Sequence, residues 1–265
     1  MNAVPHLEAV TGPKQAAGWG DLIDELDRWA EVERVARFWW RDDDAVQPTP
    51  QLDRLLVLAD GVPIGLAVIP AAVEPGLAER LSGLGWAGVL QHGWRHANHG
   101  RHGKKSEYPP TRNSAEVAVE LADGRACLAA LFGPQALPIF VPPWNRFAPD
   151  FLSLLPAAGL GALSAMAPNR GPPLPPGIAG IDVHVDPVAW KDGSGFIGTE
   201  TALSRILGEL RTRRLGDMPV STAIGILTHH LIMDDPTAAF IARLRTVIRE
   251  HGAARWMAPE EMLPA

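Results

Sequence analysis

The feature of the sequence that most limits its fold is the alternation of short, continuously apolar runs with amphipathic segments. The apolar runs predict strands at residues 35–40, 62–69, 86–91, 137–141, 160–165, 178–185, 221–227 and 254–257. The amphipathic segments predict helices at residues 22–35, 49–60, 75–84, 113–132, 148–158, 199–214 and 236–251. Strands that are apolar along their whole length favour a parallel sheet that is covered on both faces.

Strand-then-helix units repeated seven or eight times predict an α/β protein with a distorted or incomplete parallel (β/α) barrel of seven to eight strands. An open, doubly wound sheet is the competing topology. The chain of 265 residues suits one such domain, and no internal repeat or long linker divides it. We therefore predict a single domain over residues 1–265, in which residues 1–20 form a loosely ordered N-terminal extension.

Composition excludes several classes of protein. A net charge of −6 disfavours a nucleic-acid-binding protein, and the lack of an apolar run of about 18 residues excludes a transmembrane helix. Cys127 is the single cysteine, so neither a disulfide framework nor a cysteine-rich metal site can form within the chain. Residues 1–20 lack the basic and apolar regions of a signal peptide, and we expect a cytoplasmic protein.

Carboxylates, imidazoles or a proline-containing turn follow five of the predicted strands, at the point where each strand ends. These residues are Asp42, Asp43, Asp44, His92, Pro142, Pro143, Trp144, Asn145, Asp186, His229 and His230. Because the carboxyl ends of barrel strands meet at one face, these groups are expected to lie close together. Loops are polar in any protein, but three adjacent carboxylates repel one another, and folding alone gives no reason to keep them. The pattern therefore predicts an active site at this face.

His92 and His96 have the i, i+4 spacing that places two imidazoles on one face of a helical turn, a frequent arrangement of metal ligands. One aspartate of the acidic triplet would complete a two-His, one-carboxylate set, which leaves coordination positions open for water and substrate. A neighbouring aspartate that is not a ligand can deprotonate the water. His229 or His230 can then protonate the leaving group.

These segments resemble, in type and order, the motifs of the polysaccharide deacetylase (NodB-homology, carbohydrate esterase type) superfamily, whose members are metal-dependent deacetylases on a distorted (β/α) barrel. The resemblance spans residues 38–230. The family's first motif, a strand that ends in Asp-Asp, is matched by RDDDA. The resemblance makes Asp43 the general base and Asp44 a metal ligand, and a shifted frame makes Asp42 the alternate.

The remaining motifs complete the site that the resemblance implies. The His-x-x-x-His motif is HGWRH, which makes His92 and His96 the other ligands of one divalent metal ion, expected to be Zn²⁺, with other divalent transition metals as alternatives. The strand end FVPPWNR assigns the backbone N–H of Trp144 to the oxyanion. The segment ILTHH makes His229 the general acid and His230 its alternate. The residues expected to line the substrate site are Trp94, Pro143, Asn145, Arg146, Asp186 and Trp190.

Two positions depart from the family pattern. Val141 stands where the family often has an arginine that orients the catalytic aspartate, and Arg41 or Arg146 could replace that arginine. Ala189 precedes Trp190 where the family usually has an aspartate, although Asp186 lies three residues earlier. Loss of such supporting contacts would shift the pKa of the base or the acid and lower activity.

We therefore expect a metal-dependent hydrolase that removes an acyl group, acetyl in the family, from an amide or ester of a small-molecule or oligosaccharide substrate. No nucleic-acid or membrane partner is expected. The alternative is a catalytically impaired barrel that binds metal or carbohydrate, an interpretation motivated by Val141 and Ala189. A non-haem iron oxygenase could use the same ligand set, but the barrel pattern and the FVPPW segment disfavour it.

Overall fold

The structure is a computed structural model that describes residues 17–101, 103–167, 172–191, 193–219 and 222–264. Its strands are β1 (Ala36–Ala45), β2 (Ile64–Val68), β3 (Ala87–His92), β4 (Ala136–Val141), β5 (Ala162–Leu163), β6 (Ala179–Gly180), β7 (Ile224–Thr228) and β8 (Ala254–Trp256). Its α-helices are α1 (Trp19–Glu31), α2 (Pro50–Ala59), α3 (Pro75–Leu81), α4 (Ser114–Phe132), α5 (Thr199–Leu215) and α6 (Asp235–Glu250). Every strand falls within or overlaps one of the predicted apolar runs.

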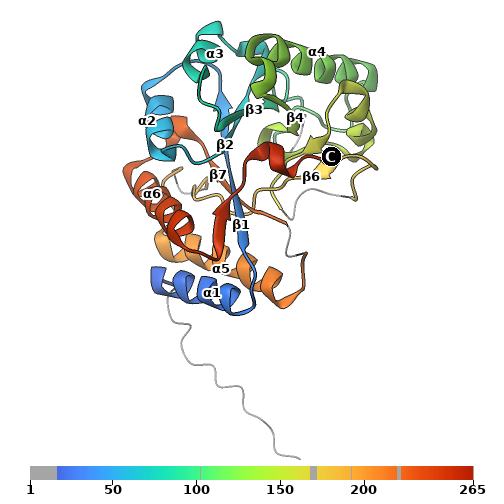
Figure 1. Cartoon of the computed structure of the whole chain (residues 1–265). Coiled ribbons are helices and arrows are strands. Elements are labelled where there is room, and N and C mark those ends of the chain that lie inside the picture. Colours follow the sequence, from blue (N-terminus) through green and yellow to red (C-terminus); the bar gives the residue numbers. More distant parts are fainter. Residues whose placement is uncertain (1–16, 102, 168–171, 192, 220–221, 265) are drawn as a thin grey trace, which may run out of the picture.

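The strands form one sheet, and all of its ladders are parallel. Their order is β6-β5-β4-β3-β2-β1-β7, and β8 pairs with the first residues of β1. The sheet curls, and the chain after β6 reaches β7 through a single bridge between Val185 and Ile226. The fold is therefore an incomplete (β/α) barrel, as predicted, and not the open sheet (Figure 1).

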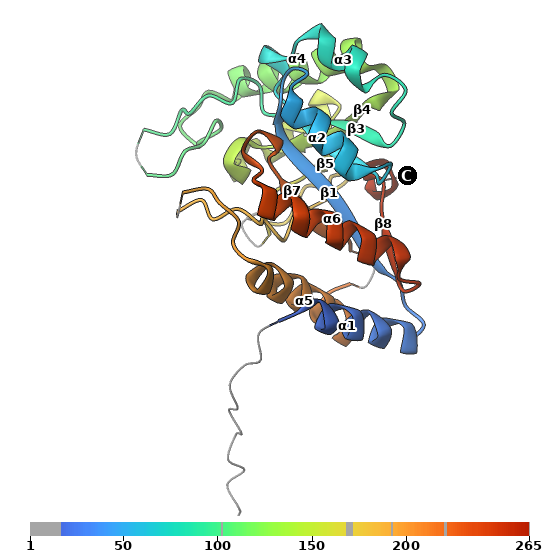
Figure 2. The ribbon, with the colours of Figure 1, turned by 90° about the vertical axis from the view of Figure 1, so that its left-hand side faces the viewer.

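Alternation along β1 separates the inside of the barrel from its helical cover. Trp39 lies in the interior cluster with Leu90 and Val141, whereas Trp40 packs in the larger cluster between sheet and helices. The helices surround the sheet, with α1 against α5, α2 against α6 and α3 against α4 (Figures 1 and 2). The helices carry the polar surface and the strands are buried on both faces, so the strands read as continuous apolar runs.

Short-range signals in the sequence account for the helix ends. The Thr49 side chain accepts a hydrogen bond from the Leu52 N–H, and Pro50 occupies the first turn of α2. The Asn113 side chain caps α4 in the same way. The predicted helix at 148–158 is wrong: the chain forms two short 3₁₀ helices there, Pro149–Leu154 and Pro156–Ala158. Two prolines in this stretch each remove a backbone donor, which disfavours a continuous α-helix.

The start of α1 at Trp19 falls inside the stretch predicted as an N-terminal extension, of which residues 1–16 lie outside the described residues. None of the described helices has the length and apolarity needed to cross a membrane. The loop that follows β3 projects from the molecule on the side where β1 ends (Figure 2). The candidate site lies on this side, at the carboxyl ends of the strands.

Candidate active site

A β-bulge at the end of β1 determines which aspartates of the triplet face the same way. Asp42 pairs with Leu66 of β2 and Ala45 pairs with Val68, so β1 contains one extra residue between these pairs. Asp44 has a left-handed backbone, with φ of 75°. In a regular strand, Asp43 would point away from both neighbours. The bulge removes that alternation, and Asp43 and Asp44 line the same cavity.

Asp42 points away from this cavity, into the space between the sheet and the helices. Its carboxylate accepts a hydrogen bond from the Thr228 hydroxyl and pairs with Nδ1 of His230. Burial opposes the charged form of His230, but the charge of Asp42 and this hydrogen bond outweigh burial and raise the pKa of the imidazole. Asp42 and His230, the two alternates, thus bind each other and do not line the cavity.

Asp44, His92 and His96 form a group with the geometry of a metal site. Oδ1 of Asp44 lies 3.2 Å from Nε2 of His92 and 3.4 Å from Nε2 of His96. This oxygen is buried and hydrogen-bonds to none of the described residues. Two imidazole nitrogens and one carboxylate oxygen that converge without hydrogen bonding suit a divalent cation, and three protein ligands leave coordination positions open.

The charges around this group favour a cation. Burial raises the pKa of Asp44, but the close contact with His92 and the charges of His92 and His96 outweigh burial, and the net pKa is far below the usual range. The pKa of His92 is raised, because the charges of Asp43 and Asp44 exceed the effect of burial. Burial and the neighbouring His92 lower the pKa of His96. A lowered pKa favours the neutral imidazole, which is the form that can bind a metal.

A hydrogen bond orients the ring of His92, and an aromatic contact orients that of His96. Nδ1 of His92 lies 3.0 Å from the carbonyl oxygen of Val141, and because a carbonyl only accepts, Nδ1 carries the proton and Nε2 faces Asp44. The ring of His96 packs against that of Trp144, with 4.3 Å between centroids.

The predicted helical turn between His92 and His96 is wrong. His92 ends β3, and the chain then turns through left-handed residues at Gly93 and His96. Glu107 holds this loop: its carboxylate accepts hydrogen bonds from the backbone N–H groups of Trp94, Arg95 and Ala97. Burial raises the pKa of Glu107 despite these three donors. The spacing of the two histidines thus fits a metal site through a loop wrapped around a buried carboxylate.

Arg41 holds Asp43 at the wall of the cavity. Its Nε lies 2.8 Å from Oδ1 of Asp43 as an ion pair, and its Nη2 donates to Oδ2 at 3.0 Å. The same guanidinium donates to Oδ1 of Asn145 and to both oxygens of Ser164. Arg41 is fully buried. Of the two arginines considered as substitutes for the one expected at position 141, Arg41 is the one that contacts Asp43.

The segment after β4 reaches the cavity through a 3₁₀ turn, Pro143–Asn145. Trp144 and Asn145 both have φ of 55°, a left-handed conformation that is costly for tryptophan. Pro142 and Pro143 have no N–H, so the amide of Trp144 is the first backbone donor after Val141. Of the seven non-glycine residues with positive φ among those described, four line this cavity: Asp44, His96, Trp144 and Asn145. Such strain concentrates at functional sites.

His229 lines the cavity, and its ring meets the edge of Trp190 with 4.8 Å between centroids. The Nε1 of Trp190 donates to Oδ2 of Asp186 at 2.7 Å, and the Val188 N–H donates to the other oxygen. Burial raises the pKa of Asp186. Asp186 and Trp190, which the sequence separates by three residues, thus form one unit beside His229.

The cavity has a volume of about 400 Å³. The predicted residues that line it are Asp43, Asp44, His92, His96, Trp144, Asn145, Arg146, Asp186, Trp190 and His229. Trp94 and Pro143, which were also predicted to line the substrate site, are not among the residues that line this cavity. The guanidinium of Arg95 lies over the ring of Trp94, and Pro143 is buried next to Gly93.

Three supporting residues escaped the sequence interpretation: Glu107, Ser164 and Met166, the last of which lines the cavity. Glu107 had a usable signal, because it is the single acidic residue in the basic segment RHGKKSEY. Ser164 and Met166 lie near the end of β5 within an apolar run, and nothing in the sequence marks them.

Comparison with solved structures finds the same fold in carbohydrate-active esterases. A family 4 carbohydrate esterase from Streptomyces lividans, solved with acetate, is 17% identical with a TM-score of 0.55, covering 87% of this chain and 97% of its own. A family 4 acetyl xylan esterase from Clostridium thermocellum, solved with a cobalt ion, is 14% identical (TM-score 0.51; 85% and 89% covered). A structure described as a polysaccharide deacetylase from Mycobacterium smegmatis is 16% identical (TM-score 0.60; 86% and 88% covered).

No protein-family model matches the sequence, and no curated protein matches it. The structural likeness covers 87% of this chain in the Streptomyces lividans comparison and 86% in the Mycobacterium smegmatis comparison. The chain therefore has the fold of the polysaccharide deacetylases, the family that its sequence motifs resemble.

Proposed function

We propose that the protein is a metal-dependent hydrolase that removes an acetyl group from an amide or ester of a carbohydrate-like substrate. One observation carries the proposal: Asp44, His92 and His96 converge in a cavity that Asp43 and His229 also line. This is the set of groups that metal-assisted hydrolysis requires, namely three ligands, a base and an acid.

The ligands Asp44, His92 and His96 suit Zn²⁺, and Co²⁺ or another divalent transition metal would fit the same set. Bound there, the ion would polarise the acyl carbonyl and lower the pKa of a water molecule. The orphaned Oδ1 of Asp44 and the fixed proton on Nδ1 of His92 support this assignment.

Asp43 acts as the general base in this proposal. Its carboxylate takes the proton of the attacking water, and Arg41 holds that carboxylate in position through the paired contacts at 2.8 and 3.0 Å. Because Arg41 also binds Asn145, the position of the base is coupled to the segment that carries the Trp144 amide. That amide donates to the oxygen that becomes negative as water adds to the acyl carbon.

His229 acts as the general acid and gives a proton to the departing amine or alcohol. Its ring packs against the edge of Trp190. Its Nδ1 is buried and hydrogen-bonds to none of the described residues. Trp190 donates a hydrogen bond to Asp186 and contacts the ring of His229, so it connects this carboxylate to the candidate acid.

The departures at Val141 and Ala189 do not favour the catalytically impaired alternative. Arg41 supplies the guanidinium that Val141 cannot, and Asp186 reaches Trp190 and the surroundings of His229 from three residues before Ala189. Trp144 and Trp190 add aromatic faces at the cavity, which suit packing against a sugar ring.

The test is metal analysis followed by acetate release from a panel of N- and O-acetylated sugars. Wild type is expected to bind one divalent ion and release acetate. Asp43→Asn should keep the ion and lose activity, whereas His92→Ala should lose both, and the exposed His99→Ala should behave as wild type. A wild type that binds the ion and hydrolyses nothing would support the impaired alternative. Retention of the ion by His92→Ala would refute the ligand set.

A further inference from the structure

A second and larger cavity adjoins the active-site cavity. Its volume is about 710 Å³, and the two cavities share Trp144, Asn145 and Arg146 as a common wall. The other lining residues come from the loop after β3 and from the segment after β4: Gly100, Arg101, Lys104, Ser106, Tyr108, Pro109, Pro110, Thr111, Phe147, Ala148 and Pro149. The two cavities therefore lie side by side, on either side of Trp144, Asn145 and Arg146.

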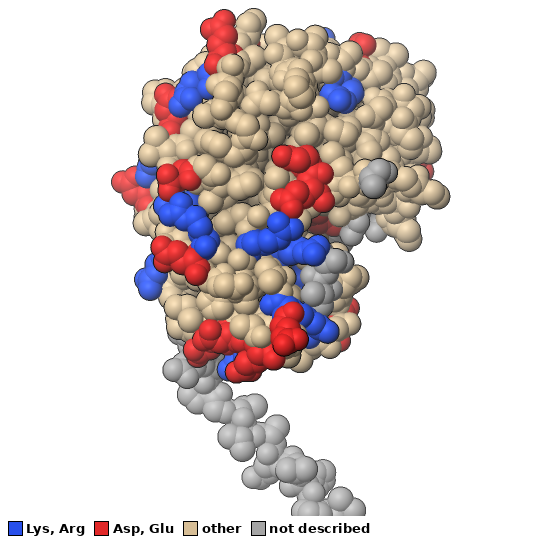
Figure 3. All heavy atoms as spheres, viewed as in Figure 1, with Lys and Arg blue, Asp and Glu red and all other residues tan. Residues whose placement is uncertain are grey.

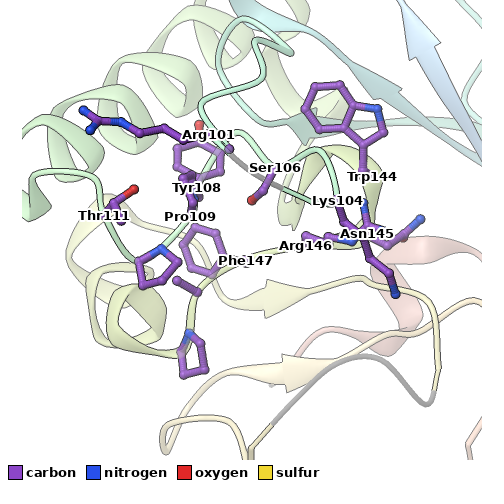
Figure 4. Close-up of a pocket in the computed structure, with 14 residues that line it drawn as sticks. Arg101, Lys104, Ser106, Tyr108, Pro109, Thr111, Trp144, Asn145, Arg146 and Phe147 are labelled. Atoms are coloured by element: carbon purple, nitrogen blue, oxygen red, sulfur yellow. The ribbon is translucent and has the colours of Figure 1, made fainter.

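The second cavity is basic. Its lining includes Arg101, Lys104 and Arg146 and no acidic residue, and we call it the basic groove. No carboxylate among the described residues forms an ion pair with any of these three cations. Figure 4 shows Lys104 and Arg146 together near Trp144, with Arg101 towards the other end of the groove.

The acidic residue nearest in sequence does not neutralise the groove. Glu107 is buried, and its carboxylate is occupied by three backbone N–H groups of the loop that carries His96. Arg146 donates from Nη1 to the carbonyl of Lys105 at 2.8 Å, which orients its guanidinium without cancelling its charge. Lys105 adds a further cation, 5.9 Å from the centroid of Trp144.

Elsewhere the charges are mixed. On the face that carries β8 and α6, Lys and Arg side chains alternate with Asp and Glu side chains (Figure 3). Surface arginines there are paired, as in Arg54 with Asp235 and Arg249 with Asp60. In a chain of net charge −6, three unpaired cations around one cavity are a local exception. A cavity lined by one sign of charge attracts ligands of the opposite sign.

The groove also has an apolar floor. The rings of Tyr108 and Phe147 pack edge to face with 5.3 Å between centroids, and Pro109 lies next to them (Figure 4). Pro149 also lines the groove. The hydroxyl of Tyr108 is buried and hydrogen-bonds to none of the described residues. Apolar surface below and cations at the rim suit a ligand that has an apolar ring face and an anionic substituent, as an acidic sugar does.

We propose that the basic groove binds an anionic group, phosphate or carboxylate, on the substrate whose acetyl group enters the active-site cavity. The inference rests on the proposed function and narrows it, from acetylated carbohydrates in general to acidic ones. The shared wall at Trp144 to Arg146 places the anion beside the reacting sugar, so the groove selects among acetylated substrates by charge.

The test compares three sugars that carry the same acetamide: neutral N-acetylglucosamine, N-acetylglucosamine 1-phosphate and N-acetylmuramic acid, whose extra charge is a carboxylate. Wild type is expected to show a higher kcat/KM for one anionic sugar than for the neutral one, and the preferred sugar distinguishes phosphate from carboxylate. In the double variant Arg101→Gln/Lys104→Gln, the ratio of anionic to neutral kcat/KM should fall about 10-fold. Loss of a hydrogen bond to a charged group typically weakens binding by about this factor.

Arg80→Gln is the matched control, because Arg80 is a surface arginine of α3, paired with Asp53 and outside both cavities. It should leave the ratio as in wild type. If the double variant has the same ratio of anionic to neutral kcat/KM as Arg80→Gln, the groove does not bind the anionic group. The proposed function would stand. A wild type that prefers the neutral sugar contradicts binding of the anionic group too.

Failure of the proposed function has a different signature, since no sugar then releases acetate. In that case, calorimetric binding of the same three sugars to wild type and to the double variant tests whether the groove binds an anionic group. If wild type binds an anionic sugar more tightly than the neutral one and the double variant does not, the groove binds anions even though the protein does not hydrolyse these sugars. Equal binding by the two proteins rejects it.

Discussion

The guanidinium of Arg41 contacts both carboxylate oxygens of Asp43, two residues further along the same strand, at 2.8 and 3.0 Å. Both side chains are buried and point to the same side of β1, as the alternation of a strand requires. The remaining donors of Arg41 bind Asn145 and Ser164, which follow β4 and β5. One side chain thus ties the candidate base to the ends of two other strands.

The first prediction concerns this pair. Arg41→Lys keeps the positive charge but cannot bind Asp43, Asn145 and Ser164 together, because lysine lacks the planar fork. We expect kcat to fall about 10- to 100-fold. This is part of the rate acceleration of about 10²- to 10⁴-fold that general-base catalysis typically supplies. KM and bound metal should change little, since Arg41 does not line the cavity. Steady-state kinetics with metal analysis measures this split.

Two further variants separate positioning by Arg41 from structural support. Ser164→Ala removes one partner of Arg41 without touching Asp43 and should lower kcat by a smaller factor. Arg41→Met leaves the buried carboxylate of Asp43 unpaired and should destabilise the fold by about 3–5 kcal/mol, measured by urea unfolding. Unchanged kcat in Arg41→Lys would show that the arginine does not position the base.

The second prediction uses the buried pair of Asp42 and His230. The pKa of His230 is raised in the folded state, so the folded protein holds the imidazole proton more tightly than the unfolded chain. The resulting stabilisation is fully present below the unfolded pKa of about 6.5 and is lost as pH rises through the raised value. His230→Gln should therefore lower the free energy of unfolding more at pH 6 than at pH 9.

The control for this pH dependence is His251→Gln, which removes an imidazole that pairs with Asp27 at the surface. Water screens that pair, so its loss should change stability little at either pH. A double-mutant cycle with Asp42→Asn isolates the coupling between the two buried groups. A coupling energy equal at pH 6 and pH 9 would contradict a charged pair.

Much of the fold could be predicted because its signals are local. β2 is apolar throughout and β3 is apolar as far as Leu90. Thr49 and Asn113 mark the starts of the helices that they cap. In a parallel barrel the carboxyl ends of the strands meet at one face, so their proximity can be predicted without information on distant contacts. The convergence of Asp44, His92 and His96 follows from that topology.

The details that decide roles within the site could not be predicted in the same way. The bulge that turns Asp43 and Asp44 to one side depends on the register of β1 against β2, which the triplet itself does not encode. The loop after His92 takes its shape from Glu107, which contacts it from more than ten residues away. Local propensity favoured a helical turn there, and the tertiary hydrogen bonds override it.

The third prediction follows from Gly93, which has φ of 61° and no room for a side chain. An added Cβ would overlap a carboxylate oxygen of Glu107 and lie 2.6 Å from Cγ of Pro143. Gly93→Ala should displace the loop that holds His96 and weaken metal binding about 10- to 100-fold, as loss of supporting contacts typically does. Competition with a metal chelator measures the affinity.

Gly208→Ala provides the matched control within α5. A Cβ at Gly208 meets nothing within 4 Å, so alanine should stabilise the helix by about 0.5–1 kcal/mol and leave the metal affinity unchanged. If Gly93→Ala binds metal as tightly as Gly208→Ala does, the loop does not need its left-handed turn.

The last prediction tests His229 against its neighbour His230. A general acid matters when the leaving group is a poor one, so His229→Ala should lower kcat about 10²- to 10⁴-fold for an acetamide. The same variant should hydrolyse p-nitrophenyl acetate with little loss, because nitrophenolate departs without a proton. His230→Gln, whose ring binds Asp42 and not the cavity, should affect the two substrates by similar factors. Equal losses on both substrates in His229→Ala would mean that this imidazole shapes the cavity and donates no proton.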